Sequence, residues 1–143
     1  MSARSPWRLL PLTTLALLCL GHGGGGCEKE GSHANHSHEG RASGATCPEE
    51  GGPTARDFGH TFLESYCLSC HSASVTGPAR QGAPGEVNFD TLEDVRQWAE
   101  SIDMHCAAGP SASNTAMPPT SSHHQPTQEE RLKLGQWLAC GAR

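Results

Sequence analysis

Five consecutive residues, Cys67-Leu68-Ser69-Cys70-His71, hold two thiols separated by two residues and an imidazole that follows directly. Three kinds of site use such residues: a dithiol redox pair, part of a zinc site, and a covalent attachment point for a porphyrin. Each kind places different demands on the neighbouring sequence. The sequence on either side of the pentapeptide therefore indicates which of the three kinds of site it forms.

The neighbouring sequence favours the porphyrin. A thioredoxin-like dithiol follows a strand in a βαβ unit, and no such pattern precedes Cys67. A zinc site needs a second pair of ligands at matching spacing, whereas Cys106 and Cys140 stand alone. In Cys-x-x-Cys-His the two thiols reach one porphyrin edge, and the histidine becomes the proximal iron ligand. We expect one haem c, held covalently by Cys67 and Cys70 and ligated by His71.

The candidate for the second axial ligand is Met117, in the stretch Ala-Met-Pro-Pro that ends at Pro119. A thioether is a soft, neutral donor that raises the reduction potential. The two prolines stiffen the loop that would present it, because each fixes its φ. Four histidines remain as alternatives, and a bis-histidine site would have a lower potential. These are His60, His105, His123 and His124.

Hydrophobic periodicity predicts an all-α fold of three to four helices around the haem. The first is expected over residues 54–67, the next over residues 90–105, and the last over residues 127–140. Thr127 and Glu130 form the pattern of a capping box at the start of the last helix. The Gly- and Pro-rich segment between the first two helices is expected to be a loop.

These features together resemble a class I cytochrome c domain over residues 54–143. The features are a helix leading into Cys-x-x-Cys-His, a Met-Pro-Pro loop, and a last helix that ends Trp-Leu-Ala-Cys-Gly. More narrowly, the chain is similar to the lipoprotein-like cytochromes of delta-proteobacteria such as myxobacteria. The resemblance implies an iron-containing electron carrier of the cell envelope.

The resemblance also implies two structural details. The first and last helices of such domains cross closely at a glycine, which here would be Gly59 under Trp137. A proline carbonyl accepts the N–H of the proximal histidine, and Pro84 or Pro78 could supply that carbonyl. A bond of this kind would orient the ring of His71.

The first 26 residues are typical of an export signal. Arg4 and Arg8 precede an apolar run over residues 9–20 that is too short to span a membrane. Small residues then lead to Cys27, which resembles the lipidated cysteine of a bacterial lipoprotein; Cys19 is a second candidate. We expect the mature protein on the periplasmic side of the envelope, lipid-anchored to the inner or outer membrane if Cys27 is modified.

Residues 27–53 are rich in Gly, Ser, His and Glu and show no periodicity. Such a segment buries too little apolar surface to order itself, so we interpret it as a flexible tether. His33, His36 and His38 could bind a transition metal loosely, or they could simply be solvated. The domain proper is expected over residues 54–143.

The remaining cysteines suggest one disulfide. Cys106 follows the second predicted helix and Cys140 ends the last, and an oxidising compartment permits a bond between them. We expect Cys106–Cys140, with free buried thiols as the alternative. Cys47 is then left over, unless Cys27 is not lipidated and pairs with it.

Composition limits the function classes. At 143 residues and a formal net charge of −5, the chain offers no basic face for nucleic acid. The sequence contains no nucleophile–base or paired-carboxylate pattern, so we expect an electron carrier that meets a redox partner protein rather than an enzyme. Two alternatives remain: a haem sensor or peroxidase-like enzyme with an exchangeable sixth ligand, and a non-haem, disulfide-bonded structural lipoprotein.

Overall fold

The computed structural model describes residues 40–143. The predictions for the export signal, for Cys27 and Cys19, and for the first three histidines of the tether lie outside these residues. No helix in the described part of the chain is long and apolar enough to cross a membrane.

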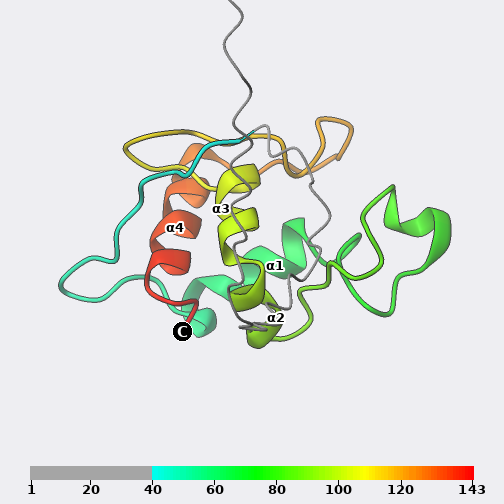
Figure 1. The fold of residues 1–143 in the computed structure, drawn as a ribbon, viewed down its shortest axis with the longest axis horizontal. Helices are drawn as coiled ribbons and strands as arrows, with labels where there is room; N and C mark the ends of the chain where they lie inside the picture. Colours follow the sequence, from blue (N-terminus) through cyan, green and yellow to red (C-terminus); the bar gives the residue numbers. More distant parts are fainter. Residues whose placement is uncertain (1–39) are drawn as a thin grey trace, which may run out of the picture. The chain divides into compact units, whose positions relative to one another are not determined.

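Four α-helices form the domain, joined by long irregular segments, and residues 40–143 contain no strand (Figure 1). The all-α prediction is confirmed. Helices α3 and α4 lie side by side, and α1 runs past their ends (Figure 1). In chain order the elements are η1 (Ala55–Gly59), α1 (His60–Tyr66), η2 (Gly77–Arg80), α2 (Leu92–Gln97), α3 (Ala99–Cys106) and α4 (Gln128–Ala139).

The first predicted helix forms as the π-helical turn η1 followed directly by α1. Thr54 begins it with a capping box, in which its hydroxyl accepts from the Asp57 N–H and the Asp57 carboxylate accepts from the Thr54 N–H. Phe62 and Leu63 are buried on its inner face. The helix ends at Tyr66, and Cys67 is its C-cap residue, so the first cysteine of the motif is held by an ordered element.

Helices η1 and α4 cross at Gly59, as the resemblance implied. A Cβ atom at Gly59 would lie 2.6 Å from Cε2 of Trp137, closer than real Cβ contacts allow. Trp137 is fully buried, and Phe58 meets it edge-on with ring centroids 6.3 Å apart. Glycine therefore permits the close approach that buries the largest side chain of the core.

The helix predicted over residues 90–105 is interrupted. Trp98, with ψ of 9°, leaves the helical region between α2 and α3. The expected start is confirmed, since Thr91 caps α2 through a box with Asp94. Val95 and Ile102 still fall on the buried face, so the break leaves the apolar stripe intact.

The predicted tether ends earlier than expected, because the chain is already packed on the domain at Ser43. Ser43 is buried, and its N–H and hydroxyl donate to the two carboxylate oxygens of Asp103 at 2.7 and 2.6 Å. These hydrogen bonds order a segment that has almost no apolar residues to bury. The domain therefore begins ahead of residue 54.

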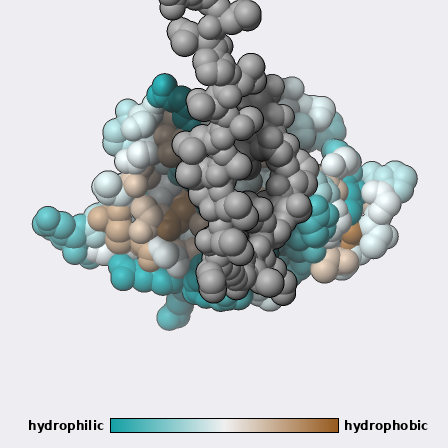
Figure 2. All heavy atoms as spheres, in the orientation of Figure 1, coloured by the Kyte–Doolittle hydropathy of each residue, from teal (hydrophilic) through white to brown (hydrophobic). Residues whose placement is uncertain are grey.

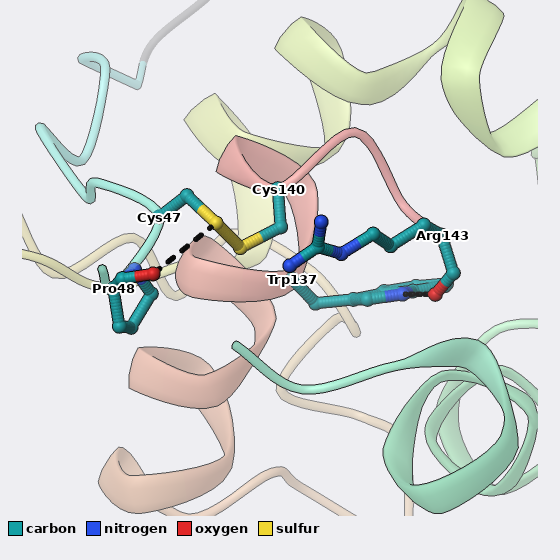
Figure 3. The surroundings of a disulfide bond; sticks show 5 residues. All are labelled: Cys47, Pro48, Trp137, Cys140 and Arg143. Atoms are coloured by element: carbon teal, nitrogen blue, oxygen red, sulfur yellow. Dashed lines mark hydrogen bonds between the residues drawn. A yellow bond between two sulfur atoms is a disulfide. The ribbon is translucent and has the colours of Figure 1, made fainter. Parts of the chain in front are cut away.

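The disulfide prediction is wrong in one partner: Cys140 is bonded to Cys47, not to Cys106 (Figure 3). The anchored segment after Ser43 carries Cys47 to the end of α4, next to Trp137 and Arg143 (Figure 3). Cys106 is a free, buried thiol, because the end of α3 turns it into the core. The bond closes a loop across a sequence separation of 93 residues.

The described surface in Figure 2 mixes hydrophilic and hydrophobic residues, with hydrophilic ones at the outer edges. Two large hydrophobic side chains are exposed, Met117 at 39% and Leu132 at 41%. The ion pairs within residues 40–143, Arg96–Glu93 and Lys133–Glu129, are both exposed and contribute little stability. Two arginines, in contrast, are buried: Arg80 and Arg131.

Candidate haem site

The Cys-x-x-Cys-His pentapeptide folds as a tight turn at the end of α1. The N–H groups of Cys70 and His71 both donate to the carbonyl of Cys67, at 3.1 and 2.9 Å. The Cys67 N–H in turn donates to Leu63, which anchors the turn to the helix. Cys67 and Cys70 are both free and half-buried. The turn therefore gathers two available thiols and the imidazole on one short piece of chain.

Burial keeps the thiols of Cys67 and Cys106 protonated. Burial raises the pKa of Cys67 above its ordinary value, and the nearby Cys106 and Cys70 thiols raise it further. Burial also raises the pKa of Cys106 to about 11, although the Arg131 guanidinium opposes this shift. A catalytic dithiol needs a lowered thiol pKa. The site therefore does not suit the thioredoxin-like alternative.

His71 is oriented by a backbone carbonyl. Its Nδ1 lies 3.0 Å from the carbonyl oxygen of Val87, and the Phe89 ring stacks on it with centroids 4.7 Å apart. Burial lowers the pKa of His71, while the bond to Val87 opposes that shift, so the ring is neutral near pH 7. With Nδ1–H donating, Nε2 carries the lone pair that binds a metal.

The acceptor for His71 differs from the expected one. The resemblance suggested Pro84 or Pro78, but the carbonyl belongs to Val87. Pro84 instead accepts a hydrogen bond from Arg80. The long loop after the motif turns back on itself before Val87, and this later residue is the one that reaches the ring.

Arg80 holds that loop together from inside. It is 7% exposed and lies at the end of η2. Its guanidinium donates only to uncharged oxygens of the loop, over distances of 2.6 to 3.1 Å. The acceptors are the carbonyls of Ser72, Val75, Ala83, Pro84 and Val87 and the side-chain oxygen of Asn88. The hydrogen bonds of Arg80 therefore hold the backbone of this loop in place of the regular hydrogen bonds of a helix or strand.

Met117 lies on an exposed loop whose backbone is fastened to the core. Its N–H donates to the His105 carbonyl at 2.9 Å, and its own carbonyl accepts from Nη1 of Arg131 at 2.8 Å. The same Nη1 lies 2.9 Å from the carbonyls of Cys106 and of Asn114. An exposed thioether on a fixed backbone suits a ligand better than core filler.

The alternative histidines are placed differently. His60, His123 and His124 are exposed. Nδ1 of His105 lies 2.7 Å from the carbonyl of Ser101, one turn earlier in α3. That bond orients the His105 ring along its own helix.

The Met117 loop and the motif are both attached to the hydrophobic core. Arg131 donates to the carbonyls of Met117 and Cys106, and Cys106 belongs to the core cluster against which Cys67 packs. The loop of the candidate distal ligand is therefore fastened to a residue of the same cluster that the motif contacts.

These residues fit a covalent haem. The donor set comprises two unbonded thiols and a neutral imidazole with one free nitrogen, which suit covalent attachment and proximal ligation of haem c, and a thioether that could serve as the sixth ligand. Apolar residues near the motif pack on the core but stay only half-buried, as expected where a porphyrin completes the core. They include Leu68, Val87 and Leu92.

The other ligands considered fit less well. Within residues 40–143 no three His, Cys, Asp or Glu side chains are grouped to hold a metal ion, so the zinc alternative lacks its ligand set. A cavity of about 120 Å³ between Leu63, Leu68, Phe89 and Leu92 is too small for a porphyrin. We assign it no ligand.

Sequence reasoning missed Arg80 and Arg131. Arg131 could have been found, because it precedes Leu134 and Leu138 by three and seven residues and so shares their buried face. Arg80 sits in a Gly- and Pro-rich loop without periodicity, and its burial has no comparable signal in the sequence.

Comparisons with protein-family models, with curated proteins and with solved structures found no significant match to this chain.

Proposed function

We propose that the domain is a mono-haem c-type cytochrome that carries single electrons. The proposal rests on one observation above all: a Cys-x-x-Cys-His turn with both thiols free and the His71 ring oriented by the Val87 carbonyl. A bond from Nδ1–H to a carbonyl fixes the tautomer and leaves Nε2 for iron. Nothing else in residues 40–143 gathers comparable chemistry.

Each residue has a defined role in this proposal. Cys67 and Cys70 hold the haem through thioethers, His71 is the proximal ligand, and Met117 is the distal ligand. When bound, the haem iron supplies the one-electron couple. Because both axial positions belong to the chain, the protein needs no substrate pocket, and the alternative of an enzyme is not favoured.

The proposed location is the periplasmic side of the cell envelope. The Cys47–Cys140 disulfide supports it, since such bonds persist in oxidising compartments. Anchoring to the inner or outer membrane would depend on lipidation of Cys27. The partner would be a redox protein, and the net charge of −5 argues against nucleic acid.

One observation favours the second candidate, a haem sensor or peroxidase-like enzyme with an exchangeable sixth ligand. The Met117 side chain is 39% exposed, so an external ligand could compete for its position. The bond from Arg131 to the Met117 carbonyl opposes such exchange. The third candidate, a non-haem structural lipoprotein, accounts for the disulfide but not for the thiols left free in the motif.

Absorption spectra of the full chain, matured in a host that attaches haem c, test the proposal. We expect the reduced protein to show the sharp bands of a low-spin haem and to bind carbon monoxide slowly at pH 7. Rapid carbon monoxide binding would favour the sensor or peroxidase. Colourless protein would leave only the structural lipoprotein.

A further inference from the structure

We propose that Arg80 and Arg131 are positioning residues for the two axial ligands, and that their buried charges raise the reduction potential. This inference rests on the proposed function, because it concerns how the chain holds His71 and Met117. Arg80 is hydrogen-bonded to the loop that follows His71, and Arg131 is hydrogen-bonded to the loop that carries Met117.

On the distal side, Arg131 joins the last helix to the Met117 loop. It is 3% exposed, and its Nη1 lies within 2.9 Å of the carbonyls of Cys106, Asn114 and Met117. Hydrogen bonds from a charged donor are about twice as strong as neutral ones. A bond between a thioether and iron is weak, so a ligand of this kind depends on the backbone that carries it being fixed.

On the proximal side, Arg80 shares an acceptor with His71. Its Nη2 lies 2.9 Å from the Val87 carbonyl, the same oxygen that His71 Nδ1 approaches to 3.0 Å. A carbonyl that already accepts from a guanidinium is a weaker acceptor for the imidazole. Arg80 therefore both fixes the oxygen that orients the ring and limits how much electron density the ring gains from it.

Both charges are uncompensated by contact. Within residues 40–143 no carboxylate forms an ion pair with Arg80 or Arg131. Asp90, whose carboxylate feels the charge of Arg80, is bonded to Ser72 and Ala73 instead. A guanidinium stays charged in proteins. Because oxidation adds a positive charge to the site, a buried cation nearby favours the reduced protein.

The test uses the full chain as holoprotein, with each arginine changed to Gln, which removes the charge, and to Lys, which keeps it. Arg56→Gln is the matched control, because Arg56 is exposed on η1. For Arg131→Gln we expect carbon monoxide to bind about tenfold more tightly, the factor that one charge-assisted hydrogen bond represents. Arg131→Lys keeps a charged donor without the guanidinium fork, so we expect a smaller increase. The Arg80 variants leave the Met117 backbone fastened, so their carbon monoxide affinity should change less than that of Arg131→Gln.

Reduction potentials separate charge from geometry. Arg80→Gln and Arg131→Gln should both lower the potential, and the Lys variants should lower it less. Arg56→Gln should leave it unchanged. Equal potentials in all variants and the wild type, measured on protein that holds its haem, would overturn the charge argument. Unchanged carbon monoxide affinity in both Arg131 variants would overturn the positioning role.

If the variants do not fold, a measurement on the wild-type protein still tests the proposal. The guanidinium protons of Arg80 and Arg131 should exchange with solvent slowly by NMR, whereas those of Arg56 exchange fast. Fast exchange at either buried arginine contradicts the proposal for that residue. Wild-type protein without haem would instead refute the proposed function, so the two failures are distinct.

Discussion

Nδ1 of His71 lies 3.0 Å from the carbonyl oxygen of Val87, sixteen residues further along the chain. This contact closes the loop after the motif and fixes the imidazole ring. The backbone bond from the Phe89 N–H to the His71 carbonyl, at 2.8 Å, joins the same two ends of the loop. The ring of His71, the proposed proximal ligand, is therefore oriented by the loop that follows it.

Removing either thiol of the motif should prevent stable haem attachment. We expect Cys67→Ala and Cys70→Ala to lose most of their holoprotein yield, because one thioether cannot hold the porphyrin edge as two do. Haem per protein after purification measures the effect. Cys106→Ala is the matched control, since Cys106 is also a free cysteine but lies outside the motif. Equal loss in all three variants would contradict the assignment of the two thiols.

Removing Met117, the proposed distal ligand, should change the absorption spectrum but not the covalent attachment of haem. Met117→Ala should keep its covalent haem and lose the weak charge-transfer band that methionine bound to oxidised haem iron gives at the red end of the spectrum. Met104→Ala, on α3, is the control and should keep the band. A band that survives in Met117→Ala would assign the sixth position to another residue, and the histidines at 60, 105, 123 and 124 would be tested next.

The disulfide should be a major source of stability. By chain entropy, a bond that closes a loop with a separation of 93 residues stabilises the fold by about 4.6 kcal/mol. Cys47→Ser and Cys140→Ser should each lower the free energy of unfolding in urea by an amount of that order. Cys106→Ser should lower the free energy of unfolding less, because Cys106 is a free, buried thiol and its replacement breaks no disulfide. If Cys106→Ser instead abolished a bond with Cys140, the pairing described here would be wrong.

The helix crossing should tolerate no side chain at Gly59. A methyl group there would lie 2.6 Å from Cε2 of the buried Trp137, so Gly59→Ala should cost about 1–3 kcal/mol of stability through overpacking. Gly85→Ala is the control, because a Cβ at that position meets no atom within 4 Å. The two urea midpoints give the comparison, and equal midpoints would mean that the crossing is looser than described.

Acid should weaken the start of α4. Hydrogen bonds from the Thr127 N–H and hydroxyl, and from Tyr66, hold the pKa of Glu130 below its usual value. The stabilisation is therefore complete above about pH 4.3, the pKa of an unfolded glutamate, and is lost as the pH falls through the lower folded value. Glu130→Gln should destabilise the domain by about 1 kcal/mol or less at pH 7, because the site is exposed. Between pH 6 and a pH below about 4, the urea midpoint should fall less for Glu130→Gln than for the wild type. An equal fall in both proteins would show that Glu130 does not contribute to the acid sensitivity.

Much of the fold could be predicted from local signals. The capping box of Thr127 and Glu130 and the apolar stripe through Trp137 locate the last helix, and Thr54 and Thr91 mark the starts of two others. These signals are short in sequence and depend on hydrogen bonds within a single turn. The break at Trp98 has no such signal, since the stripe through Val95 and Ile102 continues across it.

What the sequence could not predict depends on distant parts of the chain. The pairing of Cys47 with Cys140 requires the segment before Thr54 to pack on the domain, as the hydrogen bond between Ser43 and Asp103 shows, and no sequence periodicity indicates this packing. The acceptor for His71 is Val87 rather than a proline because Arg80 shapes the loop between them. The Cys-x-x-Cys-His motif could be identified from the sequence, because its five residues are adjacent.

The most direct test of the account is whether the matured protein carries haem bound covalently. The full chain, purified from a host that attaches haem c, is denatured and extracted with acidified acetone. The account predicts that the pigment stays with the protein, and that the protein mass exceeds the mass of the mature chain by that of one haem. Pigment that is extracted completely, or a purified protein without colour, would contradict it.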